Sequence, residues 1–160
     1  MNETGQTTAA FLRARRTRLG FRKLGPATGA IWTLCGNIYL NSRLYPPDQT
    51  PATHPWLLSL IVHEAVHLRQ GWLTALSVYG ELEAWQAGIA FYCEAAGRPP
   101  QGRLAEILAL PLGWDRQVLR RARELMQRYA GRKYRADLLP LYPIHYETRY
   151  WLTRQSPQLR

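Results

Sequence analysis

The chain has 160 residues, of which 46% are hydrophobic, so it is long and apolar enough for one domain, residues 1–160, with a substantial core. Its formal net charge of +10, from 21 lysines and arginines against 11 acidic residues, is compatible with an acidic or nucleic-acid partner. No apolar run approaches the ~18 residues of a membrane span, and two lone cysteines, Cys35 and Cys93, argue against a disulfide scaffold, so a reducing cytoplasm is the expected location.

The N-terminal segment, residues 1–24, begins polar and then becomes strongly basic. Its positive residues are Arg13, Arg15, Arg16, Arg18, Arg22 and Lys23. No apolar stretch follows these charges, so the segment lacks the layout of a signal peptide. We expect it to be either a basic amphipathic arm or disordered.

The next segments have the composition of strands and then of a loop. Residues 30–35 and 37–41 are rich in β-branched and aromatic side chains, which predicts two strands, with a bulge or tight turn at Gly36 between them. Residues 46–55 contain four prolines and are expected to form a loop. A helix should follow, with Thr53 or His54 as its N-cap.

This predicted helix, from about residue 55 to 70, contains the pattern His63-Glu64-x-x-His67 within an apolar stretch. Two imidazoles four positions apart lie one turn apart on the same face of a helix, so their nitrogens can share one metal ion. Glu64 faces the same site and can take a proton from a water molecule that the metal activates. The alternative interpretation is a pair of core histidines that hydrogen-bond to backbone or carboxylate.

A catalytic zinc usually has three protein ligands, and two carboxylates follow the histidines at a suitable distance, Glu81 and Glu83. We expect them in a second helix, from residue 73 or 74 to 96, packed antiparallel on the first and ended by Gly97. They lie ~200° apart around such a helix, so only one of them can face the metal. Nitrogen and carboxylate ligands predict one Zn²⁺ ion, although iron, manganese or cobalt would also fit.

At these residues the chain resembles the gluzincin metallopeptidases, in which a His-Glu-x-x-His helix precedes a helix that carries a glutamate ligand. In several such families this glutamate opens a Glu-x-x-Ala segment, often followed by Asp. The corresponding segment here is Glu81-Leu82-Glu83-Ala84, followed by Trp85. The resemblance covers about residues 31–97. It implies Glu81 as the third ligand, with Glu83 in reserve, and a strand along the cleft that pairs with an extended peptide.

Downstream of Gly97, a short helix is predicted over residues 103–110, and Asp115 is the expected N-cap of an arginine-rich helix that ends near Gly131. The arginines on one face of this helix lie opposite apolar residues, as in an ordinary surface helix, although a basic face can also bind nucleic acid. The tail, residues 137–146, is aromatic and rich in proline, and a last helix is expected over residues 146–153.

Together these elements predict an α+β fold that is mostly helical. In this fold a small N-terminal β-hairpin or sheet packs on the helix with the His-Glu-x-x-His pattern. The second, antiparallel helix carries the third ligand.

The predicted function is that of a zinc-dependent metallopeptidase that hydrolyses peptide, or other amide, bonds in a peptide or protein substrate. Glu64 would be the general base and would later pass its proton to the leaving amine. A peptidase also needs a donor that stabilises the oxyanion, and the candidates in the tail are Tyr142, His145 and Tyr146. The alternative function is a non-catalytic metal-binding module with a regulatory or partner-binding role, in which nucleic acid is one conceivable partner.

Overall fold

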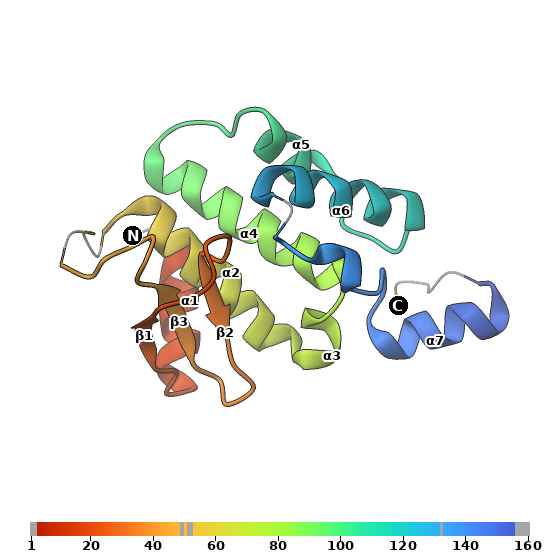
Figure 1. Cartoon of the computed structure of the whole chain (residues 1–160), viewed down its shortest axis with the longest axis horizontal. Helices are drawn as coiled ribbons and strands as arrows, with labels where there is room; N and C mark the ends of the chain where they lie inside the picture. Colours follow the sequence, from red (N-terminus) through yellow and green to blue (C-terminus); the bar gives the residue numbers. More distant parts are fainter. Residues whose placement is uncertain (1–2, 49, 51–52, 132, 156–160) are drawn as a thin grey trace.

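The structure of the protein is a computed structural model, which describes residues 3–48, 50, 53–131 and 133–155. The fold is α+β and mostly helical, with a small sheet at one end of the molecule (Figure 1). The elements are α1 Glu3–Ala14, β1 Leu19–Arg22, β2 Ala30–Trp32, β3 Ile38–Asn41, α2 Pro55–Gln70, α3 Trp72–Ala75, α4 Val78–Ala96, α5 Arg103–Ala109, α6 Arg116–Ala130, the 3-10 helix η1 Ala136–Leu138 and α7 Ile144–Thr153. None of the helices in these residues combines the length and the apolar character that crossing a bilayer requires.

The sheet has the strand order β1-β3-β2 and lies against α2 (Figure 1). The predicted hairpin is confirmed, because β2 pairs antiparallel with β3. Its first strand is shorter than the predicted residues 30–35, since the chain already turns after Trp32. The amide of Gly36 donates to the carbonyl oxygen of Thr33 at 2.8 Å, and Gly36 adopts a φ of 81°. A left-handed φ of this kind favours glycine, which explains the residue at this turn.

The expectation of an arm or a disordered segment at residues 1–24 is wrong for residues 3–24. Helix α1 packs on α2, where Leu12 is buried together with Ala65 and Leu68. The guanidinium of Arg69 lies 4.8 Å from the centre of the Phe11 ring. β1 then adds to the sheet parallel to β3. Such pairing joins residues about twenty positions apart, so a local reading of the basic residues does not reveal it.

The predicted second helix is confirmed but is divided into α3 and α4. Ser77 lies between them in an extended conformation, and its hydroxyl accepts a hydrogen bond from the amide of Gly80 at 3.0 Å. This side-chain bond is a helix N-cap, so α4 begins anew at Val78. From there α4 runs back along α2 in the opposite direction, as predicted (Figure 1). The two helices share the most extensive contact between any two elements in the described part of the chain.

Gly80 is where α3 and α4 come closest. A Cβ atom added at Gly80 would lie 2.1 Å from the carbonyl oxygen of Thr74, which belongs to the backbone and cannot swing away. We therefore expect Gly80→Ala to lower the free energy of unfolding by about 3 kcal/mol, measured by urea unfolding. Gly113→Ala is the matched control, because nothing lies within 4 Å of its added Cβ. Equal unfolding midpoints for the two variants would contradict the close approach.

The largest core cluster lies between α4, α5, α6 and the tail. Asp115 caps α6 as predicted, since its carboxylate accepts from the amides of Gln117 and Val118 at 2.7 and 2.9 Å. α6 buries its apolar face in this cluster, and several of its arginines make contacts within the protein. Arg116 pairs with Glu147 at 3.0 Å, Arg121 pairs with Glu106 at 2.7 Å, and Arg123 donates to the carbonyl oxygen of Leu139 at 2.8 Å. These contacts weaken the case for a nucleic-acid surface on this helix.

Candidate metal centre

Helix α2 positions the two histidines. It begins after His54, whose ring accepts a weak hydrogen bond from the amide of Leu57, and Pro55 occupies the first turn, as predicted. α4 can approach α2 closely because Gly88 faces it. A Cβ atom added at Gly88 would lie 3.1 Å from the carbonyl oxygen of Ser59 and 3.4 Å from Cβ of His63. The close approach brings a carboxylate of α4 within reach of the histidine rings.

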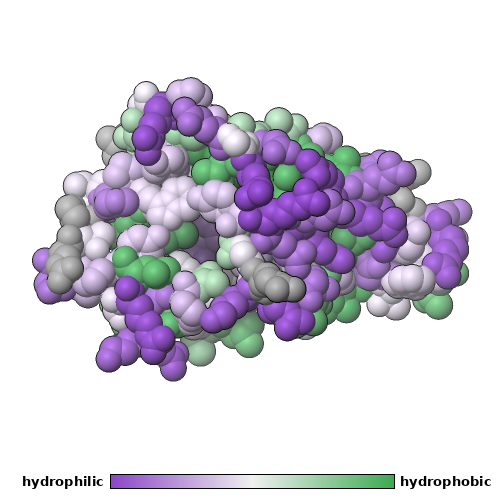
Figure 2. Space-filling view, turned by 45° about the horizontal axis from the view of Figure 1, so that its top comes forward, coloured by the Kyte–Doolittle hydropathy of each residue, from purple (hydrophilic) through white to green (hydrophobic). Residues whose placement is uncertain are grey.

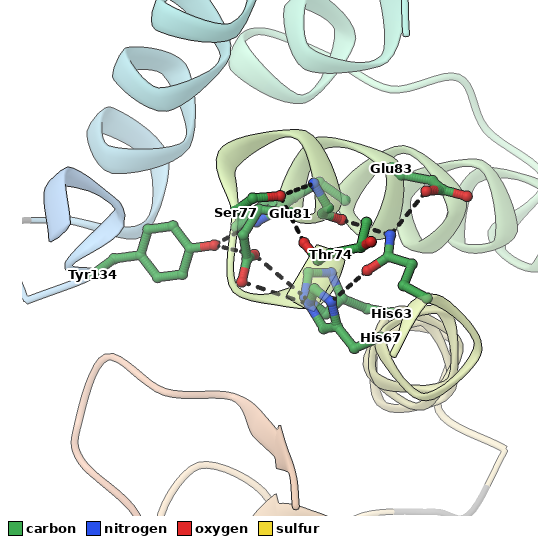
Figure 3. A network of polar contacts seen from close by, with 10 residues as sticks. His63, His67, Thr74, Ser77, Glu81, Glu83 and Tyr134 are labelled. Carbon is green, nitrogen blue, oxygen red and sulfur yellow. Dashed lines mark hydrogen bonds and ion pairs between the residues drawn. The ribbon is translucent and has the colours of Figure 1, made fainter. Parts of the chain in front are cut away.

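Three side chains converge at this point: His63 and His67 from α2, and Glu81 from α4 (Figure 3). The two Nε2 atoms are 3.1 Å apart, and the Glu81 carboxylate oxygens lie 3.7 Å from Nε2 of His63 and 3.5 Å from Nε2 of His67. Ligands of a tetrahedral zinc ion are about 3.3 Å from one another, given metal–ligand distances of about 2.0–2.1 Å. These distances involve both Glu81 oxygens, Oε2 for His63 and Oε1 for His67, and one donor atom from each residue lies within 4.8 Å of the other two, so the three side chains could share a single cation.

Hydrogen bonds behind the rings fix the orientation of His67. Its Nδ1 donates to Oε1 of Gln70 at 3.1 Å, and the amide nitrogen of Gln70 donates to the carbonyl oxygen of Gly80 at 3.0 Å and to Glu83 at 2.9 Å. Because both donors of Gln70 are used, its oxygen must face His67, and the proton of this ring is held on Nδ1. Glu83, the reserve ligand, thus holds Gln70 and not a metal ion (Figure 3).

The protonation state of His63 suits a metal site. Burial, followed by the neighbouring His67, lowers the pKa of His63 well below its usual value. The His63 ring also has a hydrogen bond with the backbone of Ala84, which falls to Nδ1 because Nε2 faces His67. Each ring then directs an Nε2 lone pair at the other ring and at the Glu81 carboxylate. A divalent cation satisfies all three donors at once, so the residues fit the ion that the sequence predicts.

Glu64 lies beside this triad and is 6% exposed. Its burial, followed by the negative charge of Glu81, raises its pKa to about 8, and a hydrogen bond with the backbone of Trp32 in β2 lowers it in part. The carboxyl group is thus held between the histidine helix and the sheet. This position is suitable for a group that accepts a proton near neutral pH and later returns it.

The raised pKa of Glu64 gives the metal-free protein a specific pH dependence. Below pH 4.5 this carboxyl is protonated in both states, and between pH 4.5 and about 8 only the folded state keeps the proton. The folded state therefore loses stability as the pH rises through this window. As the pH rises from 4.5 to 8, we expect the free energy of unfolding of Glu64→Gln to increase relative to that of wild type by on the order of 3 kcal/mol. Unfolding measured with a chelator present tests this. A difference in free energy of unfolding between the variant and wild type that does not change with pH would contradict this prediction.

Tyr134, in the segment after α6, was not predicted and lies at the triad. Its hydroxyl donates to the Glu81 carboxylate and accepts a hydrogen bond from Nε1 of Trp85 at 2.9 Å (Figure 3). Burial, followed by the charge of Glu81, raises the pKa of Tyr134 well above its usual value, so the phenol stays protonated and can donate. Trp85 follows the Glu81-Leu82-Glu83-Ala84 segment, at the position where gluzincin patterns often have Asp. It thus contacts Glu81, the candidate third ligand, through this tyrosine.

The triad opens into a cavity of about 680 Å³, and a hollow with hydrophobic and hydrophilic borders is visible on the face shown in Figure 2. β2, α2 and α4 form its walls, together with Tyr129, Ala130, Lys133, Tyr134 and Arg135. Aromatic rings surround the histidines, since the ring of Trp32 lies 6.1 Å from that of His67 and the ring of Trp85 lies 5.9 Å from that of His63. These rings give the cavity apolar walls next to the two histidines.

The three tail residues predicted to stabilise an oxyanion do not line this cavity. Tyr142 is fully buried in the main core, where its hydroxyl donates to the carbonyl oxygen of Trp114 at 2.8 Å. Tyr146 packs on the ring of Trp114 at 5.1 Å, and His145 is exposed beside Tyr146. The structure therefore places these three side chains apart from the triad and its cavity. The apolar tail buries its aromatic rings against the α4–α6 core, and Tyr134 is the phenol that reaches the site.

Comparison of the chain with protein-family models, with curated proteins and with solved structures found no match. The features of this chain that bear on its function are the three converging side chains, the buried Glu64 and the edge strand β2 beside the cavity.

Proposed function

We propose that this chain is a zinc-dependent metallopeptidase of the gluzincin type, which hydrolyses peptide or other amide bonds. The observation that carries the proposal is the convergence of His63, His67 and Glu81, with one donor atom of each within 4.8 Å of the others, beside the buried carboxyl of Glu64. Two neutral imidazoles and one carboxylate are a donor set that suits zinc and leaves a coordination position for a further ligand.

When bound, zinc would supply Lewis-acid polarisation of the substrate carbonyl and lower the pKa of a water molecule. Side chains of the protein would transfer the proton and hold the metal ligands in position. Glu64, with its raised pKa, would take a proton from the attacking water and transfer it to the leaving amine. Tyr134 would hold the Glu81 carboxylate in position, and Gln70 would do the same for the His67 ring.

The edge strand β2 supports a peptide as the substrate. Its bonds to β3 use alternate residues, since the amide of Asn41 donates to Gly29 and that of Thr33 donates to Asn37, both at 2.9 Å. The backbone groups of Ala30 and Trp32 therefore point to the other edge of the strand, where the amide of Trp32 already donates to Glu64 and the groups of Ala30 remain for a peptide. Both residues line the cavity. An extended peptide that pairs with this edge would pass beside the triad, which is a common way for proteins to bind peptides.

The proposal is tested by incubating the zinc-loaded, full-length protein with a mixture of unstructured peptides and analysing the products by mass spectrometry. We expect defined cleavage products that disappear when a chelator removes the metal and return when zinc is added back. A zinc-loaded protein that leaves every peptide in the mixture intact would contradict the proposed activity.

A further inference from the structure

The cavity beside the triad is long enough to bind several residues of a substrate. The α2 residues that line it include Trp56, Leu60 and His63, which recur on one face of the helix. Trp56 precedes His63 by seven residues, which corresponds to about 10 Å along the helix axis. An extended peptide covers that distance with about three residues.

The end of the cavity at Trp56, here called the aromatic end, is formed by large apolar side chains. It consists of Tyr45, Trp56, Leu60 and Tyr129. The rings of Trp56 and Tyr129 are 6.4 Å apart, and a further edge-to-face contact joins Tyr129 to Trp85 beside the triad at 5.5 Å. Tyr129 is nevertheless 41% exposed, so part of its ring is available to a ligand. A large apolar side chain would bury the most surface here.

The charges around the cavity are asymmetric. Among its lining residues the only acidic groups are Glu64 and Glu81, which belong to the candidate metal centre, and the basic residues are Lys133 and Arg135. Arg135 already pairs with Asp137 at 3.0 Å, whereas no ion pair engages Lys133 in the part of the chain that the structure describes. Lys133 therefore adds a positive charge that the protein does not neutralise locally. A negative group on a ligand would complement it.

From these two features, and on the basis of the proposed peptidase function, we infer that the preferred substrate carries a large apolar side chain for the aromatic end and an acidic side chain for Lys133. Lys133 precedes Tyr134, which contacts Glu81 at the triad, and the aromatic end lies about three extended residues from the triad, so we expect the two groups within about three residues of each other. The apolar contact supplies most of the affinity. The acidic contact lies at the exposed rim, so it contributes less and weakens as the salt concentration rises.

The test measures peptide binding instead of cleavage. The full-length, zinc-loaded Glu64→Gln variant is titrated into fluorescein-labelled hexapeptides, and fluorescence anisotropy gives the affinity. The peptides consist of glycine and serine with one Phe and one Asp two positions apart, in both orders. We expect a change of Phe to Ala to weaken binding at least about tenfold, and a change of Asp to Lys to weaken it about fivefold.

Two pairs of protein variants separate this site from general effects. Lys133→Glu should weaken binding of the Asp peptide about fivefold and reverse the preference between Asp and Lys, whereas Lys23→Glu, which removes the other lysine of the chain, should not. Tyr129→Ala should remove most of the preference for Phe over Ala. Trp151→Ala, at a ring that is 56% exposed outside the cavity, should leave this preference unchanged.

Equal effects of Lys133→Glu and Lys23→Glu would overturn the acidic contact, because the loss would then follow net charge alone. Equal affinity for the Phe and Ala peptides would overturn the aromatic end. These outcomes are distinct from failure of the proposed function. A protein that binds with this selectivity but cleaves nothing supports the inferred substrate preference and contradicts the peptidase activity. A protein that cleaves peptides without this selectivity supports the peptidase activity and contradicts the inferred preference.

Discussion

Replacement of Glu64 by glutamine is expected to lower kcat/KM for peptide cleavage by about 10²–10⁴-fold while zinc content stays at the wild-type level. Glutamine has nearly the same shape and keeps an oxygen that can accept from the backbone of Trp32. It cannot take up a proton from water. Because Glu64 is not among the three converging donors, the histidines and Glu81 should still hold the ion.

Steady-state kinetics on a peptide identified as a substrate, with elemental analysis of the same preparations, measure both quantities. Glu106→Gln is the matched control, since Glu106 is an exposed residue of α5 that pairs with Arg121 outside the cavity. We expect this control to retain wild-type kinetics. If Glu64→Gln cleaves peptide as fast as wild type, Glu64 is not the general base.

Zinc binding is expected to stabilise the folded protein strongly. A ligand that binds only the folded state at about 1,000 times its Kd adds about 4 kcal/mol to the free energy of unfolding. The three ligands come from two helices, α2 and α4, so the site forms only when these helices pack. We therefore expect zinc to raise the unfolding midpoint of wild type markedly.

The variant His67→Asn should lose this zinc-dependent gain, because it removes one of the three donors while keeping a polar side chain that can bond to Gln70. The stability of this variant without zinc serves as its own baseline, so a loss of folding is not mistaken for a loss of zinc binding. His145→Asn is the control, since His145 is exposed on α7. An equal zinc-dependent gain in His67→Asn and wild type would contradict the proposed ligand set.

The part of the site on α2 could be predicted because its signals are local. His54 and Pro55 mark the start of the helix, and Gly71 marks its end, so the observed range Pro55–Gln70 agrees with the predicted one. Within a helix, a spacing of four residues alone places His63 and His67 on one face. The relative position of these two candidate ligands therefore follows from the sequence without any knowledge of the rest of the fold.

The choice between Glu81 and Glu83 depends on tertiary structure. Helical geometry indicates that only one can face the histidines, but it does not say which, and the resemblance to gluzincins favoured Glu81. In the structure the choice follows from Gln70, which lies one turn after His67 and binds both that ring and Glu83. Glu83 is thereby turned away from the donors, and Glu81 lies at the triad.

Tyr134 could not be predicted because no local signal connects it to the site. It lies 53 residues after Glu81 in the sequence and is one of nine tyrosines. Its position depends on how α6 packs on α4 and on where the chain turns after Gly131. The same reason explains why the sequence did not indicate the position of Tyr142, whose burial in the core depends on the aromatic residues around Trp114.

The central claim is that His63, His67 and Glu81 hold one metal ion, and the most direct test is the zinc content of three dialysed proteins: wild type, Glu81→Ala and Glu83→Ala. Wild type and Glu83→Ala should each retain close to one zinc per chain, because Glu83 acts only through Gln70. Glu81→Ala should retain little, since it removes a donor. A wild-type protein without zinc, or an equal zinc content in wild type and Glu81→Ala, would contradict the proposed ligand set.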